Sequence, residues 1–310
     1  MSNLKGRSLV SVADFSREEV EQVISLALEL KSQTRAGTVH HRLPGRILAM
    51  IFEKPSTRTR LSFEAGILQL GGHGIYLSSR DMQLGRGETI GDTAQVLSRY
   101  VNAIMARTFA HQTVVDLARF GTVPVINGLS DLEHPCQALG DLLTIQEHKG
   151  RLAGLKLTYV GDGNNVANSL MLACALVGMH CTVCHPQGYA PNAAITAQAQ
   201  EIGARYGATI VATSDIGQGV GGADAVYTDV WTSMGQEGQE DARRNSFVPY
   251  QVNDALMAKA KPDAIFMHCL PAHRDEEVSA SVMDGKQSVV FDEAENRLHI
   301  QKAIMALLVP

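Results

Sequence analysis

Hydroxyl and guanidinium groups are crowded into the segment STRTR, residues 56–60. An apolar run, ILAMIF, precedes it, and Pro55 predicts a turn from a strand into a helix. Ser56 is a favourable N-cap residue, which places the backbone N–H groups of residues 57–59 at the positive end of the helix dipole. Such donors are suited to a phosphate group. The segment therefore predicts a phosphate site, and a capped helix with solvated arginines is the alternative.

The two arginines of this segment, Arg58 and Arg60, point to different sides of the predicted helix because they are two residues apart. We therefore expect only one of them to face an anion. The other is expected to pair with a carboxylate such as Glu64, which lies four residues after Arg60.

Other polar side chains stand where predicted strands end or helices begin. Arg107 ends the run NAIMAR, His134 precedes a helix that starts with Pro135, and Asp229 follows DAVYT. A histidine such as His134 is more often a capping or packed imidazole than a catalytic group. Asp229 and the polar loop around Ser233 offer an anion for an amino group and donors for a carboxylate, and a polar surface loop is the alternative. Cys269, after the run IFMH, is compatible with three roles: activated nucleophile, metal ligand or ligand contact.

The turn after the run LKLTYV argues against a dinucleotide cofactor and so against a dehydrogenase. The turn resembles G-x-G-x-x-G, but Val166 stands where the third glycine belongs, and the next strand, CTVCHP, ends without an acidic residue. Asn164, Asn165 and Asn168 instead offer neutral amides to a small polar ligand.

A metal centre is not expected either. His268, Cys269 and His273 lie close together, but no second ligand pair accompanies them, whereas structural zinc sites need four ligands. Cys181 and Cys184 have C-x-x-C spacing, yet in a predicted strand they point to opposite faces, so we interpret them as core thiols. We predict no metal and no organic cofactor.

Alternating apolar runs and amphipathic segments must position these residues. They predict an α/β fold with two open parallel-sheet domains, helices on both faces of each sheet, and interdomain helices that join them. Ligands of such sheets bind at the carboxyl ends of the strands. The first domain is expected at residues 1–150 and the second at residues 151–290. The C-terminal segment 291–310, helical from Ala294, is expected to return to the first domain.

Composition limits the classes of partner. A chain of 310 residues with 45% apolar and 19% charged residues suits two globular domains. The net charge of −5, without a block of like charges, argues against a nucleic-acid partner. No stretch approaches the roughly 20 apolar residues of a membrane helix, and no secretory signal is visible. Five scattered cysteines do not suggest a disulfide framework, so we predict a cytoplasmic location.

Four segments, STRTR, HPCQALGD, DVWTSMG and HCLP, together resemble the aspartate/ornithine carbamoyltransferase family in order and spacing. The resemblance covers nearly the whole chain. HCLP and SMG point to members that act on ornithine, because aspartate-specific members lack both and carry a lysine-bearing loop where this chain has RDMQLGRGET. The resemblance implies carbamoyl transfer from carbamoyl phosphate to the δ-amino group of L-ornithine. Another acceptor, such as acetylornithine or putrescine, and a binding protein without turnover are the alternatives.

The resemblance also implies roles for individual residues. Those that would bind carbamoyl phosphate are Ser56, Thr57, Arg58, Thr59, Gln83, Arg107, His134, Gln137, Cys269, Leu270 and Arg297. Those that would bind ornithine are Asn165, Asp229, Ser233 and Met234. The catalytic residues would be Arg58, Arg107, His134, Asp229 and Cys269. Gln83 matches a loop position that reaches a neighbouring subunit's site, which implies a homotrimer or an assembly of trimers.

The implied reaction requires two kinds of group. Negative charge develops on the carbonyl oxygen, and Arg107, His134 and the Thr59 hydroxyl are donors of the type that stabilises it. The δ-amine must first lose a proton, because a free alkylamine has a pKa of about 10. The phosphate dianion, or Asp229 together with Cys269, is the candidate proton acceptor.

Overall fold

The computed structural model describes residues 2–82, 87–232, 238 and 240–310. The chain divides into two compact units: Met1–Leu143 with Glu295–Pro310, and Thr144–Ala294. The unit boundaries fall inside two helices, α5 (Pro135–Lys149) and α12 (Val290–Leu308). In the described part of the chain, no helix is both long enough and apolar enough to cross a membrane.

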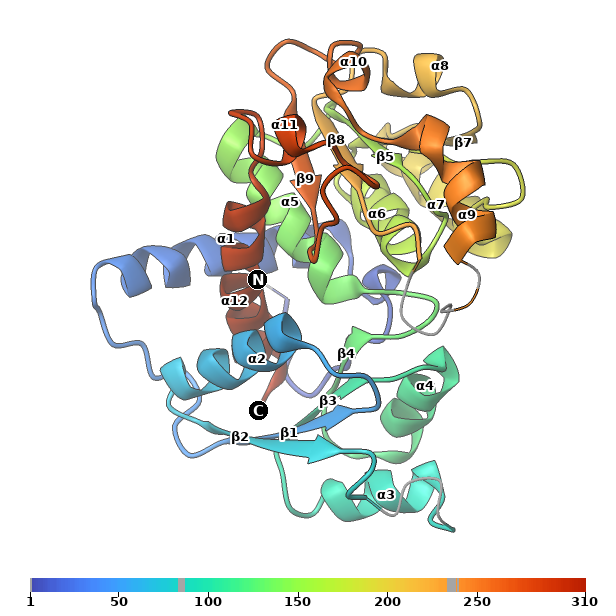
Figure 1. Cartoon of the computed structure of the whole chain (residues 1–310). Coiled ribbons are helices and arrows are strands. Elements are labelled where there is room, and N and C mark those ends of the chain that lie inside the picture. The colour runs from blue at the N-terminus through green and yellow to red at the C-terminus, as the bar shows by residue number, and fades with distance from the viewer. Residues whose placement is uncertain (1, 83–86, 233–237, 239) are drawn as a thin grey trace. The chain divides into compact units, whose positions relative to one another are not determined.

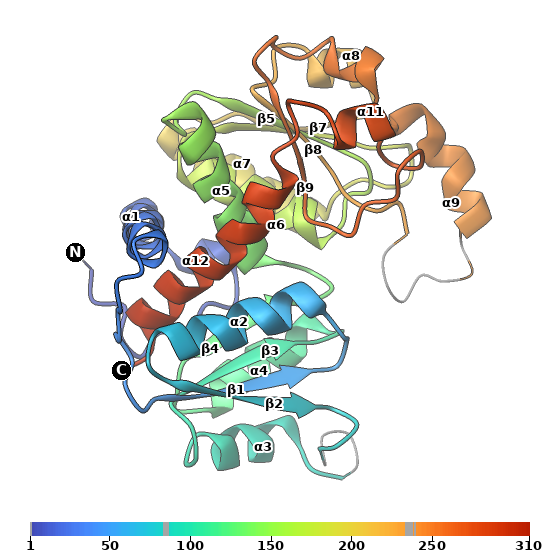
Figure 2. The same cartoon turned by 60° about the vertical axis from the view of Figure 1, so that its left-hand side comes forward.

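The first unit contains a parallel sheet in the order β2-β1-β3-β4 (Figures 1 and 2). Its strands are β1 (Ile47–Phe52), β2 (His73–Ser78), β3 (Ala103–Arg107) and β4 (Val125–Leu129). Its other elements are η1 (Val12–Asp14), α1 (Arg17–Arg35), α2 (Thr57–Gln69), α3 (Ile90–Leu97) and α4 (His111–Phe120), with parts of α5 and α12.

Helices cover both faces of this sheet because successive strand residues point to opposite sides. Ala49 and Ile51 of β1 share a core cluster with residues of α3 and α4. Figure 2 shows α2 on the other face from α3. On that face α2 approaches α12 closely: a Cβ at Gly66 would lie 3.0 Å from Met305 Cε, so only glycine leaves this contact undisturbed.

The second unit contains a parallel sheet in the order β7-β6-β5-β8-β9 (Figure 1). Its strands are β5 (Lys156–Val160), β6 (His180–Cys184), β7 (Ile210–Thr213), β8 (Ala225–Thr228) and β9 (Ile265–His268). Its helices are α6 (Asn165–Leu176), α7 (Ala193–Tyr206), α8 (Ile216–Val220), α9 (Glu240–Phe247), η2 (Val248–Tyr250), α10 (Asp254–Met257) and α11 (Ala280–Met283).

The two faces of this second sheet are also both buried. Val160, Val226 and Phe266 pack in one cluster with residues of α8, α10 and α11. Their strand neighbours Tyr159 and Tyr227 point the other way, and their rings stack with centroids 5.8 Å apart. The predicted fold class of two parallel-sheet domains with helices on both faces is confirmed.

Strand order selects one position in each sheet for a ligand. In the first sheet the chain leaves β1 on one side for β2 and on the other for β3; in the second sheet β5 stands in the same relation to β6 and β8. The carboxyl ends of strands at such a switch point form the usual ligand crevice of open α/β sheets. A ligand site is therefore expected at the segments that follow β1 and β3 in the first unit, and at those that follow β5 and β8 in the second.

The last helix differs from the expected one. It begins at Val290 rather than at Ala294. Val289 N–H donates to the carbonyl of Phe266, and Glu293 N–H then donates to the carbonyl of Val289. The apolar run SVVFDEA is thus divided: its first residues pair with β9, and helical hydrogen bonding starts directly after them.

Candidate functional site

In the first unit, the segment after β1 forms the expected helix start. Ser56 is the N-cap of α2, and its Oγ accepts from Thr59 N–H at 3.3 Å. The two arginines divide as predicted. Arg60 Nε donates to Glu64 Oε2 at 3.3 Å, and its guanidinium lies 4.1 Å from the ring centre of Tyr76. Arg58 lies near enough to His134 to lower the pKa of that imidazole.

Two of the predicted arginines donate hydrogen bonds to one buried hydroxyl. Thr59, 1% exposed, accepts at Oγ1 from Arg107 Nη1 and from Arg297 Nη2, each at 3.3 Å. Arg297 Nη1 also donates to Gln137 Oε1. These residues come from α2, β3, α5 and α12, so the fold gathers groups that are up to 238 residues apart.

The site is strongly electropositive. Burial, followed by the positive charges of Arg297, Arg107 and Arg58, holds the pKa of His134 well below its usual value of 6.5. The imidazole is therefore neutral at pH 7 and offers one N–H donor. Arg297 Nε is buried and has no hydrogen-bond partner among the described residues, so it adds a donor whose hydrogen-bonding capacity is not satisfied there. A small anion is the ligand that suits these donors.

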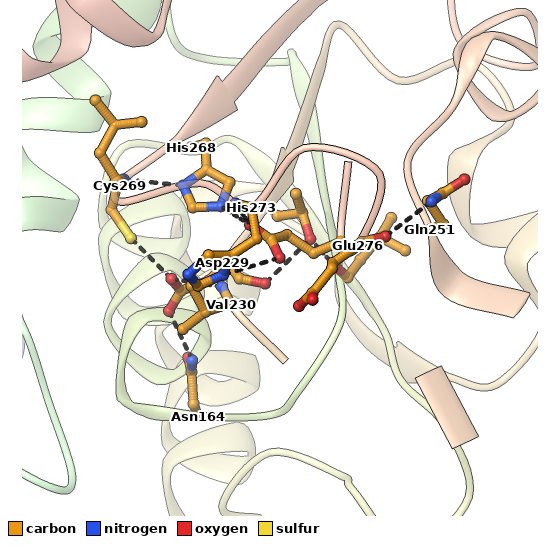
Figure 3. A network of polar contacts seen from close by, with 12 residues as sticks. Asn164, Asp229, Val230, Gln251, His268, Cys269, His273 and Glu276 are labelled. Carbon is orange, nitrogen blue, oxygen red and sulfur yellow. Dashed lines mark hydrogen bonds and ion pairs between the residues drawn. The ribbon is translucent and has the colours of Figure 1, made fainter. Parts of the chain in front are cut away.

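In the second unit, a carboxylate stands at the switch point between β5 and β8. Asp229 accepts from the side-chain amide of Asn164 at 2.9 Å and from Val230 N–H at 2.8 Å. Cys269 Sγ donates at 3.1 Å to Oδ1, the oxygen that also accepts from Val230, whereas Asn164 donates to Oδ2. Figure 3 shows Asn164 and Cys269 reaching this carboxylate from two sides.

The turn after β9 is held by a buried histidine and glutamate. His268 Nδ1 accepts from Leu270 N–H at 2.9 Å, and Nε2 lies 3.2 Å from Glu277 Oε1 (Figure 3). Since Nδ1 is an acceptor, Nε2 carries the proton and donates it to Glu277. Leu270 has φ of 59°, a left-handed conformation that is unfavourable for leucine, so this hydrogen bond stabilises a strained turn.

Two groups of described residues have the ligand types of a metal site. Asp229, His268 and Cys269 bring one possible ligand atom each to within 4.8 Å of one another, as do His273, Glu276 and Glu277. Both ring nitrogens of His268 are already engaged in hydrogen bonds. The expectation of a protein without a metal remains a prediction.

The structure places most of the predicted site residues, but not all of them. Gln83, Ser233 and Met234 lie outside the described residues. Asn165 is the first residue of α6, whereas its neighbour Asn164 makes the contact to Asp229. The sequence shows that Asn164 offers a neutral amide, but only the sheet order brings this amide beside residue 229, so its place in the site was not predicted.

Comparison with known families agrees with this architecture. Residues 7–147 match the family model described as aspartate/ornithine carbamoyltransferase, carbamoyl-P binding domain. Residues 153–308 match the model described as aspartate/ornithine carbamoyltransferase, Asp/Orn binding domain. The two models together account for nearly the whole chain.

Relatives and solved structures give the same family. The chain is 58% identical over 305 residues to the ornithine carbamoyltransferase of Anoxybacillus flavithermus, covering 98% of this chain and 97% of the relative. It is 56% identical over 306 residues to that of Thermococcus kodakarensis, covering 99% and 97%. The structure of ornithine carbamoyltransferase from Pyrococcus furiosus superposes with a TM-score of 0.97 at 52% identity, covering 100% and 99% of the two chains.

The lowered pKa of His134 leads to a testable pH dependence. Nitrogen-15 NMR of the ligand-free protein should show a neutral imidazole at pH 6, and replacing Arg297 by Gln should raise the pKa, because one of the nearby positive charges is removed. The unfolded chain binds this proton more readily, so the free energy of unfolding should decrease as the pH falls below about 6.5. A His134 ring that protonates above that pH would contradict the electrostatic description.

Proposed function

This chain belongs to the aspartate/ornithine carbamoyltransferase family, and we propose that it transfers the carbamoyl group of carbamoyl phosphate to the δ-amino group of L-ornithine, giving L-citrulline and phosphate. The observation that carries the proposal is the 58% identity to a named ornithine carbamoyltransferase over 98% of the chain. The convergence of Arg107 and Arg297 on Thr59 supports the donor half of the reaction.

Carbamoyl phosphate is assigned to the first unit. Its dianionic phosphate would accept from the backbone and hydroxyl groups of residues 56–59, and from the guanidinium groups of Arg58 and Arg107. The positive end of α2 adds favourable potential at the same place. Gln137 and Arg297 would orient the carbamoyl group, since one guanidinium already bridges Gln137 and Thr59.

The transition state requires donors for the carbonyl oxygen, which becomes negative when the amine attacks. His134 supplies an N–H from a neutral ring, and Arg107 supplies a charged donor. A donor of this kind contributes about 3 kcal/mol when it is pre-organised in a site that excludes water. His134 is 5% exposed and Arg107 is 6% exposed, which meets that condition.

L-Ornithine is assigned to the second unit. Among the described residues, the Asp229 carboxylate accepts three hydrogen bonds, and a carboxylate has about four acceptor positions, so in this part of the chain one position remains for an amino group of the substrate. The amino-acid end of ornithine is assigned to Asn165, Ser233 and Met234. The neighbourhood of its δ-amine is assigned to Cys269. The phosphate dianion and Asp229 acting with Cys269 remain the two candidate acceptors for the δ-amine proton.

We also propose a homotrimer, or an assembly of trimers, in the cytoplasm. Leu61, Leu68 and Ile75 of α2 and β2 are 59%, 54% and 46% exposed, and β2 is an edge strand of its sheet. Exposed apolar side chains beside a sheet edge favour an interface.

None of the five cysteines, all of which are described, forms a disulfide, which is compatible with a reducing compartment. Recovery of the native protein in a membrane or periplasmic cell fraction would refute this location.

The acceptor can be identified with purified protein. Carbamoyl phosphate is incubated with L-ornithine, acetylornithine, putrescine or L-aspartate, and phosphate release and the carbamoylated product are measured. We expect ornithine to be used well and the others to give at most about one hundredth of its kcat/KM, because their end groups leave polar groups of the pocket unpaired. Efficient use of another amine would replace ornithine as the acceptor. Binding without any product would indicate a protein that does not turn over.

Two neighbouring arginines provide a matched test of the phosphate site. Arg58→Gly should lower kcat/KM by about three orders of magnitude, because a charged contact to the leaving group is lost. Arg60→Gly removes an arginine from the same turn of α2, with a similar helix cost of about 1 kcal/mol, and should change kcat/KM by about threefold or less. Equal losses in the two variants would show that the helix, rather than the guanidinium of Arg58, is responsible.

The assembly can be tested by light scattering. The purified chain should have a mass of about 100 kDa, three times the 33.4 kDa of one chain, or a multiple of it. Leu61→Asp should reduce this mass, whereas Val248→Asp, at an exposed apolar residue of the second unit, should leave it unchanged. A wild-type protein of 33.4 kDa would exclude the trimer.

A further inference from the structure

Helix α9 carries an arginine that the reaction does not use directly. Arg243 is 4% exposed, although the two residues that follow it, Arg244 and Asn245, are exposed. A buried guanidinium is unfavourable unless it is paired and hydrogen-bonded, so its partners indicate what it does.

The partners of Arg243 lie in two different turns. Its Nε donates to the carbonyl of Trp231 at 2.7 Å, two residues beyond Asp229. Its Nη2 pairs with the carboxylate of Asp162, two residues before Asn164. The same side chain therefore joins the turn after β8 to the turn after β5, which are the turns that supply the carboxylate and the amide of the acceptor site.

Aromatic rings hold the guanidinium in place between these partners. Its central carbon lies 4.8 Å from the ring centre of Tyr189 and 5.2 Å from that of Phe247. The two rings contact each other edge to face, with centroids 4.7 Å apart. A planar guanidinium can stack on rings while donating in two directions, whereas a lysine ammonium is a single point charge.

The turn after β5 is also constrained by the segment that contains Tyr189 and Pro191. Gly163 N–H donates to the carbonyl of Tyr189 at 2.9 Å, and a Cβ at Gly163 would lie 2.1 Å from Pro191 N. Asn164 N–H donates to the carbonyl of Asp162 at 2.7 Å. These backbone contacts constrain the short turn that carries both Asp162 and Asn164, so we infer that a displacement of Asp162 is passed on to Asn164.

We propose that Arg243 is a positioning residue for the acceptor pocket: it ties Trp231 to Asp162 and thereby holds Asp229 and Asn164 at hydrogen-bonding distance for the substrate amine. The inference rests on the function proposed above. Asp229 and Asn164 are joined directly on one side, and Arg243 joins their turns on the other. Loss of this second connection should weaken the binding of the acceptor and leave the phosphate site of the first unit unaffected.

The test compares Arg243→Lys with Arg244→Lys in the full-length protein. We expect KM for ornithine to rise about tenfold or more in Arg243→Lys, because a small displacement of the contacting groups is costly, with KM for carbamoyl phosphate within about twofold of wild type. Arg244→Lys should leave both constants unchanged, since Arg244 is exposed. Asp162→Asn removes the other half of the ion pair and should reproduce the Arg243→Lys pattern.

If the Arg243–Asp162 ion pair had a purely structural role, the variants would behave differently. The ion pair would then stabilise the second unit, so the variants would have a lower thermal midpoint but an unchanged KM for ornithine. That result overturns the inference, as does an equal rise of both KM values. Thermal midpoints are therefore measured for every variant beside the kinetics.

Calorimetry separates this inference from the proposed function. Ornithine is titrated into the wild-type and variant proteins in the presence of inorganic phosphate. A wild-type protein that binds ornithine without turning it over contradicts the function, and weaker binding by Arg243→Lys alone would still support the positioning role. Variants that bind ornithine as tightly as the wild type, or a wild type that does not bind it, overturn the inference.

Discussion

The convergence of guanidinium groups on a buried hydroxyl is the constraint on which the first unit depends. Arg107 and Arg297, both nearly inaccessible to water, donate to the same oxygen of Thr59. Burying such cations costs several kcal/mol each unless an anion or strong acceptors compensate. Under the proposed function, the dianionic phosphate of the donor substrate would supply that compensation. Burial, together with the same positive charges, lowers the pKa of His134, so the ring would keep an uncharged N–H for the carbonyl oxygen of that substrate.

The second unit has the same kind of switch point in its sheet, but a negatively charged group stands there instead of positively charged ones. Its switch point holds the carboxylate of Asp229, which three donors fix in place. A carboxylate suits an amino group as guanidinium groups suit phosphate, so each unit has a charge complementary to the substrate assigned to it. Rigidity around the carboxylate has structural sources that lie further away, namely the His268–Glu277 pair after β9 and the Arg243–Asp162 pair beside α9.

Features governed by short-range rules were predictable from the sequence. The Ser56 cap and the pairing of Arg60 with Glu64 involve residues three and four apart, where helix geometry alone determines which side chains meet. The β–α alternation predicted the two parallel sheets for a similar reason, since burial on both faces leaves a recognisable apolar pattern. The start of the last helix at Val290 rather than at Ala294 was not predicted, because it depends on the pairing of residues 287–289 with Phe266, which is distant in the sequence.

The sequence by itself determined the fold class, the helix that begins at Thr57 and the residue types available for an anion and an amine, because these follow from local periodicity, capping and chemistry. Only the tertiary structure decided that Arg297 meets Thr59 across 238 residues, that Asn164 rather than its neighbour reaches Asp229, and that Arg243 is buried while Arg244 is not. Those outcomes depend on strand order and on which helix face is covered, and neither property is encoded in any short stretch of the chain.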